Sequence, residues 1–300
     1  MLNIDRYPVL DNGVMVIGFT GWMNGGNVSI GSVDYLIENF AAEELATIDP
    51  DSFYIYSVPA TMEISAIFRP HAKIEDGRVT GYEEPNNTFF VSEANNCMMF
   101  KGDEPHMNWH KYVDTIFDVA EQSNIGSIYF VGSVTGLVPH TRDPIFYSTI
   151  SQESLRPAIE HVDSNPTHYQ GPSSLASFFI REAEKRNIPM MTLIAGIPPY
   201  VQGTNDHCIE VTMEKLQNLT GLNIEMDELS ARRIEFSQGL DKILQKRPEL
   251  QEQIKKLEAI YDDQVEIVDE ENADDSETPA DSDTSEIRSW FDKQGFKFDS

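Results

Sequence analysis

The chain is poor in cysteine, in long apolar runs and in positive charge, and each shortage excludes a class of protein. Its two cysteines, Cys97 and Cys208, lie far apart and form no CxxC motif, so we interpret them as buried or half-buried thiols. No apolar run reaches the roughly 20 residues that a membrane-spanning helix needs. The first residues, Met1–Arg6, lack the basic flank and apolar core of a signal peptide. We therefore expect a cytoplasmic protein.

Positive charge is scarce, with 22 Lys and Arg against 50 Asp and Glu and a net charge of −28. The excess of acid is not a property of the tail alone, because residues 263–300 hold only 13 of the 50 acids. Nucleic acids and anionic membranes are bound by basic surfaces, so we expect neither as a partner. A hydrophobic content of 40% over 300 residues is still enough to bury a substantial core.

Apolar runs alternate with helical patterns over residues 9–220, and this alternation is typical of an α/β fold. We predict a mostly parallel, twisted sheet with helices on both faces, in a core domain of residues 1–221. The polar segment 69–87 fits a hairpin as well as an excursion across the sheet edge. The predicted strands are 14–19, 53–58, 89–91, 97–100, 127–132, 146–150 and 190–195, and the predicted helices are 30–42, 109–123, 173–187 and 208–219.

The chain changes character after Gly221. Residues 222–262 are rich in helix formers, with Pro248 suited to the first turn of a last helix, and we expect a helical extension that packs on the core or on a neighbouring subunit. Residues 263–286 are acidic and lack bases, which predicts a disordered linker. The segment 287–300 regains aromatic residues and is interpreted as a short docking motif or an inert tail.

The glycine-rich turn 18–27 between the first predicted strand and helix is the first candidate site. Such turns lie where α/β folds bind ligands, and a helix N-terminus favours anions. The turn has neither the lysine of a Walker loop nor the spacing of a dinucleotide-binding turn. A tight connection anchored by Trp22 is the structural alternative to a small-molecule site. The candidate residues here are Gly21, Trp22, Asn24, Gly26 and Asn27.

The loop 136–144 follows the central strand 127–132 and is the second candidate. His140 can transfer protons near neutral pH, and Arg142 can hold a carboxylate or phosphate with two parallel hydrogen bonds. The same residues also suit a locked loop or a subunit contact. Thr141 lies between them and completes the candidate set of this loop.

Two further loops are weaker candidates. Asp103, Glu104 and His106 precede a predicted helix, and their spacing fits no standard set of metal ligands. Acids ahead of a helix complement its positive end, so we expect no metal there. The loop 196–203, with Tyr200, again follows a strand at its carboxyl end.

Five motifs agree in order and spacing with a known family, although each is weak alone. The sequence resembles the proteasome assembly chaperone 2 family, in its archaeal and bacterial branch whose members sometimes carry the label ATP-grasp superfamily. The resemblance covers roughly residues 9–260. The motifs are Gly21-Trp22 with Asn24-x-Gly26, Gly102-x-Glu104-Pro105 with Trp109, Pro139-His140-Thr141-Arg142, Ile188-Pro189, and Pro199-Tyr200-Val201.

This resemblance implies an α/β fold related to nucleoside phosphorylases, a helical C-terminal extension and assembly into homo-oligomers. For some relatives it also implies a chaperone role in proteasome assembly, and the family offers no established catalytic residues. Members commonly carry Pro-His-Tyr-Val where this chain has Pro-Pro-Tyr-Val at 198–201, so a frequent histidine is missing.

Two hypotheses about function follow. The favoured one is a non-catalytic, self-associating interaction scaffold that assembles or binds a multimeric protein complex, for example a proteasome-like one, without a cofactor. The alternative is a protein that binds a nucleotide-like or carboxylate ligand, or an enzyme acting on one, in a cleft near Trp22, His140 and Arg142.

Overall fold

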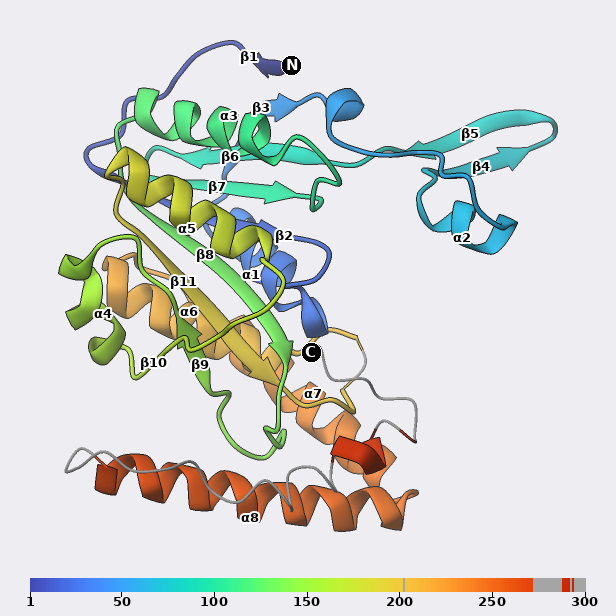
Figure 1. The fold of residues 1–300 in the computed structure, drawn as a ribbon, viewed down its shortest axis with the longest axis vertical. Helices are drawn as coiled ribbons and strands as arrows, with labels where there is room; N and C mark the ends of the chain where they lie inside the picture. The colour runs from blue at the N-terminus through green and yellow to red at the C-terminus, as the bar shows by residue number, and fades with distance from the viewer. Residues whose placement is uncertain (202, 272–287, 292, 294–300) are drawn as a thin grey trace.

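The computed structural model describes residues 1–201, 203–271, 288–291 and 293. Its centre is a nine-stranded sheet in the order β1-β3-β6-β7-β2-β8-β11-β9-β10, with helices on both faces (Figure 1). The strands are β1 Leu2–Ile4, β2 Gly13–Phe19, β3 Glu43–Ile48, β6 Asn87–Ser92, β7 Cys97–Gly102, β8 Ile125–Thr135, β9 Phe146–Ser148, β10 Asn165–Pro166 and β11 Met190–Ile197.

The middle of the sheet is parallel. Strand β2 pairs in parallel with β7 and β8, and β8 pairs in parallel with β11. The flanking strands β6 and β9 run antiparallel to this centre. All residues of β11 are buried, as expected of a parallel strand covered on both faces. The α/β fold predicted from the sequence is confirmed, with antiparallel strands added at its two sides.

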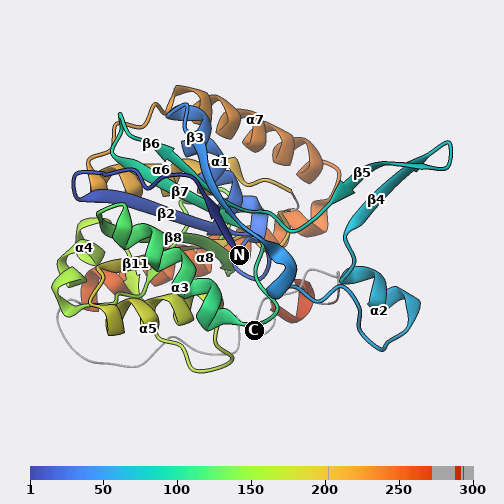
Figure 2. The same cartoon turned by 90° about the horizontal axis from the view of Figure 1, so that it is seen from above.

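Helices cover the two faces of the sheet and enclose two cores. Helices α3 (Trp109–Gln122) and α5 (Leu175–Arg186) cover one face, and α1 (Val28–Asn39) and α6 (Asp206–Thr220) cover the other (Figures 1 and 2). The first core is rich in aromatic residues, whereas the second is mainly aliphatic. Short helices α4 (Arg156–His161), η1 (Gly25–Asn27), η2 (Pro50–Ser52) and η3 (Glu153–Leu155) lie in the connections.

Two long helices follow the core. Helix α7 (Asp227–Leu244) contacts α6, and α8 (Pro248–Glu271) lies beyond the carboxyl ends of β8 and β11 (Figure 1). Helix α8 continues past residue 262, where the sequence analysis placed the start of the acidic linker. The rest of that linker, 272–286, lies outside the described residues. In the described part of the chain, no helix is long and apolar enough to cross a membrane.

An arm projects from the body between β3 and β6. We call residues 62–83 the arm: it consists of α2 (Met62–Ile67) and the antiparallel hairpin of β4 (His71–Glu75) and β5 (Arg78–Glu83). Figures 1 and 2 both show it pointing away from the sheet. The structure thus selects the hairpin from the two possibilities left open for this segment.

The strand predicted at 53–58 is wrong. Phe53 and Tyr54 follow the turn η2 and are buried without pairing to a strand. The ring of Phe53 packs edge-on against Tyr112 at 5.0 Å, and the Tyr54 hydroxyl donates to the side-chain oxygen of Asn87 or to the carbonyl of Asp103. Their apolar character therefore reflects aromatic packing and not a place in the sheet.

Candidate functional site

The loops after β2, β8 and β11 meet at the carboxyl edge of the sheet, since these three strands are neighbours and parallel. The hydroxyl of Ser133 donates to the carbonyl of Gly25 at 2.5 Å, and the amide of Gly136 donates to the carbonyl of Ile197 at 2.8 Å. The amide of Asn205 donates to the carbonyl of Gly26, also at 2.8 Å. Hydrogen bonds thus join the three loops into one rim.

The first loop is built around residues that serve its own geometry. Gly26 has a φ of +56°, and a Cβ there would lie 3.0 Å from the Cβ of Asn205. The side-chain oxygen of Asn24 accepts the amide of Ile30 at 3.0 Å and so satisfies a free donor at the start of α1. The side-chain amide of Asn27 donates to the Thr204 hydroxyl at 3.5 Å. These three candidates hold the rim together.

Gly21 and Trp22 turn away from this rim and contact Glu104. The Trp22 amide donates to Oε2 of Glu104 at 3.1 Å. Gly21 has a φ of +95°, and a Cβ there would lie 2.6 Å from the same carboxylate oxygen, so only glycine fits. Burial raises the pKa of the Glu104 carboxyl, and the hydrogen bond from Trp22 partly offsets this effect.

His140 and Tyr200 form a second, separate group. The Tyr200 hydroxyl accepts the His140 amide at 2.9 Å and lies 2.7 Å from Nδ1 of the same residue. The tautomer of His140 decides which of these two groups donates: the Tyr200 hydroxyl donates to a bare Nδ1, or a protonated Nδ1 donates to the hydroxyl oxygen. Both side chains are buried. Burial lowers the pKa of His140, with the carboxylates of Asp241 and Glu258 acting against it, and burial raises the pKa of Tyr200. The pair is therefore neutral at physiological pH.

Helix α8 covers this second group. Arg142 makes two hydrogen bonds of 2.8 Å to the carboxylate of Asp262, and Thr141 donates to Glu258. The hydrogen bonds from Arg142 hold the pKa of the Asp262 carboxyl below its usual range. The bidentate grip expected of Arg142 thus exists, but the carboxylate that it holds belongs to the same chain.

Apolar contacts complete the cover. The ring of Phe291 stacks on Tyr200 with ring centres 5.7 Å apart, and Leu257 of α8 is fully buried beside them. The sequence predicts a docking motif or an inert tail for the segment 287–300. Its described residues, 288–291 and 293, include this intramolecular contact.

One hydrogen-bonded pair near the rim, with a buried histidine and an exposed carboxylate, was not singled out from the sequence. His207, at the start of α6, lies with Nε2 3.0 Å from Oδ1 of Asp143. The pair joins the second loop to α6. Asn205 caps this helix by accepting the amide of Cys208 at 3.1 Å. Since 64 residues separate His207 from Asp143, no local sequence signal could reveal the pair.

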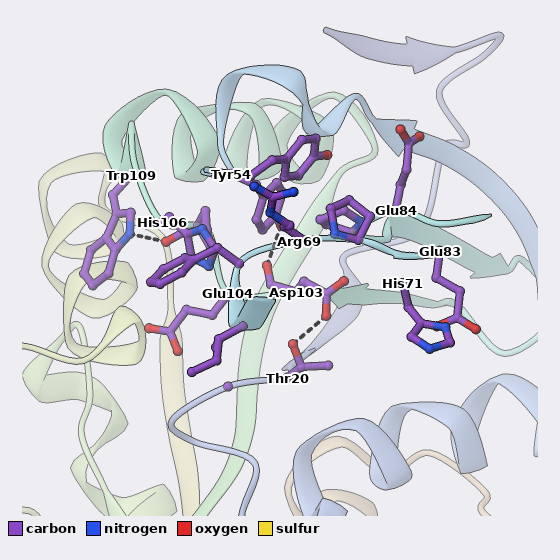
Figure 3. Close-up of a pocket in the computed structure, with 17 residues that line it drawn as sticks. Thr20, Tyr54, Arg69, His71, Glu83, Glu84, Asp103, Glu104, His106 and Trp109 are labelled. Carbon is purple, nitrogen blue, oxygen red and sulfur yellow. Dashed lines mark hydrogen bonds between the residues drawn. The ribbon is translucent and has the colours of Figure 1, made fainter. Parts of the chain in front are cut away.

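A cavity of about 680 Å³ opens at the base of the arm, and we call it the arm-base pocket (Figure 3). The body supplies Gly21, Tyr54, Glu104 and Trp109 to its wall, and the arm and its stem supply a further set of residues. Of the candidate residues named from the sequence, Gly21, Asp103, Glu104 and His106 are in this wall. No local sequence pattern indicates this pocket, because the arm lies beside body residues that are far away in the chain. In the described ranges, no three His, Cys, Asp or Glu side chains are placed to hold a metal ion.

Comparison with known sequences gives one family. A sequence model of the PAC2 family matches residues 18–244 of this chain, which includes all four candidate loops. The resemblance seen in the five motifs is therefore confirmed. No curated protein matches the chain.

Comparison with solved structures supports the same fold. Rv2714 of Mycobacterium tuberculosis, described as a protein of unknown function, superposes with a TM-score of 0.77 at 18% identity, over 89% of this chain and 92% of its own. Rv2125 of the same organism, a proteasome-assembly chaperone homologue, gives 0.66 at 21% identity, over 76% and 94%. PbaB of Pyrococcus furiosus, an archaeal proteasome activator, gives 0.57 at 14% identity, over 81% and 98%.

Proposed function

The chain belongs to the PAC2 family, and from this premise we propose that it is a non-catalytic, self-associating scaffold that binds or helps to assemble a proteasome-like complex in the cytoplasm. The names of two structural relatives, a proteasome-assembly chaperone homologue and a proteasome activator, support this choice of partner. A scaffold of this kind needs a surface that recognises protein, and it needs no reactive centre.

The observation that carries the proposal is the exposure of apolar side chains on the arm. Met62 and Ile67 of α2 are 82% and 79% exposed, and Ile74 and Val79 of the hairpin are each 65% exposed. Ile74 and Val79 are directly opposite each other in the β4–β5 register, so they form one apolar surface. Tyr82 adds a further exposed ring. Clustered apolar exposure of this kind marks a surface that another protein covers.

The shape of the arm supports the same conclusion. A lone two-stranded hairpin is at best marginally stable in water. Every residue of β4 is exposed, and so is every residue of β5 except Gly81, which is half-buried. The hairpin gains stability when its apolar surface is buried against a second copy or a partner, since each fully buried aliphatic side chain contributes about 1.5–3 kcal/mol.

The rim argues against the alternative of an enzyme. His140 is neutral and buried under α8, and the Arg142 guanidinium is already occupied by Asp262. Trp22 contacts Glu104 and not the His140 group. A nucleotide-like or carboxylate ligand at Arg142 would have to displace Asp262 first.

The test uses a double substitution, Ile74→Asp with Val79→Asp, in the full chain. Thr80→Asp is the matched control, because successive strand residues point to opposite faces and Thr80 is exposed next to Val79. Light scattering after gel filtration reports self-association, and surface-immobilised proteasome rings and their half-assembled precursors report partner binding. The proposal expects the double variant to lose both properties and Thr80→Asp to keep them. A wild-type chain that stays monomeric and binds none of these particles would refute it.

A further inference from the structure

The wall of the arm-base pocket is rich in aromatic side chains and carboxylates, and the carboxylates differ in how many hydrogen bonds they already accept. Aromatic side chains from the body and the arm stem line it, and four carboxylates face or border it. Figure 3 shows Glu104, His106 and Trp109 on one side and His71, Glu83 and Glu84 on the other, with Arg69 between them. The aromatic residues are Tyr54, Tyr56, Phe68 and Trp109, and the carboxylates are Glu83, Glu84, Asp103 and Glu104.

One of the four carboxylates accepts a hydrogen bond from the fold at each of its two oxygens. Oδ1 of Asp103 accepts the Thr20 hydroxyl at 2.6 Å, and Oδ2 accepts the Asn86 amide at 2.8 Å. Asp103 therefore fixes the end of β7 against β2 and the stem of the arm. It has little capacity left for a ligand.

The other three carboxylates keep free acceptors. Only Oε2 of Glu104 is engaged, by the Trp22 amide, and no ion pair within the described residues involves Glu83, Glu84 or Glu104. Arg69 is the one arginine or lysine in the wall, and it makes no ion pair with these groups. The pocket therefore has three available negative charges and one positive charge.

A hydroxyl without a partner lies in the same wall. The Tyr56 oxygen is shielded from solvent, and no described group hydrogen-bonds to it. A buried hydroxyl without a partner is costly, so this oxygen favours an incoming donor or acceptor. His106 cannot serve it through Nδ1, because that nitrogen accepts the Ile55 amide at 3.1 Å while the ring packs edge-on against Tyr54 and Phe68.

We propose that the arm-base pocket binds a cation of the ammonium or guanidinium type, such as a lysine or arginine side chain of a partner protein or a free alkyl amine. Aromatic faces attract such cations, and carboxylates hold them with charge-assisted hydrogen bonds. The cation would bind Glu104 between Trp109 and the tyrosines and donate to the Tyr56 oxygen. Arg69 competes with it. This inference does not depend on self-association or on a proteasome partner.

The test follows the three tryptophan indole N–H resonances in the ¹⁵N-labelled full chain during titration with N-acetyl-arginine amide. Trp109 lines the pocket, so its signal should shift and saturate. Trp290 packs against Phe291, and its signal should stay still as an internal control. Salt of about 0.15 M limits non-specific attraction to the acidic surface, because the Debye length is then about 8 Å.

Substitutions of the acidic and basic residues of the pocket should change the affinity for the cation in opposite directions. Glu104→Gln should weaken binding about tenfold, since it removes the charge but keeps an acceptor for the Trp22 amide. Arg69→Ala should strengthen binding, and the remote, exposed Glu184→Gln should change nothing. Glu84→Gln provides a second weakening variant if Glu104→Gln misfolds. Two ligands distinguish a partner's side chain from a free amine. Tighter binding of the blocked peptide Ala-Arg-Ala indicates that the pocket recognises a protein side chain. Tighter binding of putrescine indicates that it recognises a free amine.

The inference fails if N-acetyl-arginine amide leaves the Trp109 signal unmoved, or if N-acetyl-glutamate amide shifts it as strongly. It also fails if Glu104→Gln and Glu84→Gln both bind the cation as the wild type does. These outcomes are independent of the oligomeric state, so they are distinct from a failure of the scaffold proposal.

Discussion

Helix α8 should be held over the rim by a narrow apolar stripe, and Leu257→Ala should loosen it. Leu250, Ile254 and Leu257 are the buried residues of this stripe, and Leu257 is fully buried. Replacing a buried leucine by alanine costs about 2–5 kcal/mol. Full burial of each of the three side chains contributes only about 1.5–3 kcal/mol before the entropy of ordering the helix is subtracted. One substitution thus removes a large share of the local stability.

Amide hydrogen exchange measures this opening directly. The His140 amide is protected by the Tyr200 hydroxyl beneath α8. A loss of about 2 kcal/mol or more should raise its exchange rate by roughly 30-fold or more, since 1.4 kcal/mol corresponds to a factor of ten. The amides of the fully buried strand β11 should be much less affected. The control is Lys256→Ala, which removes only an exposed contact to Glu252. Unchanged exchange at His140 in Leu257→Ala would show that the stripe does not hold α8 in place.

Three further predictions concern backbone strain and pH. In urea unfolding, Gly26→Ala should lower the free energy of unfolding by about 1–2 kcal/mol, because Gly26 has a positive φ and lies close to Asn205. Gly239→Ala, in the interior of α7 with open space around it, should raise this free energy by roughly 0.5–1 kcal/mol. A change of the same sign in both variants would contradict this prediction. Burial raises the pKa of Glu104 in the folded state, so the ionised carboxylate destabilises the fold. Glu104→Gln should therefore raise the melting temperature near pH 7, and this gain should disappear as the pH falls towards the ordinary pKa of glutamate. A difference in melting temperature that stays constant with pH would refute the prediction. Burial lowers the pKa of His140, so the unfolded chain takes up a proton at this residue more readily than the folded chain. The stability should therefore be greatest above about pH 6.5 and should fall below it. In a pH series of melting curves, His140→Gln should reduce this dependence of the melting temperature on pH.

The sequence predicted the parts of the fold that depend on local pattern. The apolar runs at 127–132 and 190–195 are β8 and β11, because a parallel strand covered on both faces needs apolar residues at every position. Strand β3 was missed, since its first residues, Glu43 and Glu44, are exposed near the edge of the sheet and break the apolar pattern. Conversely, a strand was wrongly predicted at residues 53–58, because Phe53 and Tyr54 are apolar but pack against other rings outside the sheet.

The candidate residues were harder to interpret because their partners are distant in the sequence. Arg142 was correctly seen as a group suited to bidentate hydrogen bonds, but its partner Asp262 lies 120 residues away on α8. Likewise, no local pattern shows that Trp22 contacts Glu104, 82 residues away. The apolar residues of the arm look like those of any amphipathic strand, and only the structure shows that the body leaves them uncovered.

Another protein chain should cover the apolar surface of the arm. Val79→Cys puts a thiol on this surface, while burial keeps Cys208 unreactive and raises the pKa of Cys97 to about 12. The measurement is the rate of maleimide labelling as the protein concentration increases, with Thr80→Cys on the opposite face as the comparison. We expect Val79→Cys to become progressively protected while Thr80→Cys stays reactive. Equal labelling of both thiols at every concentration, with and without the proteasome particles, would contradict it.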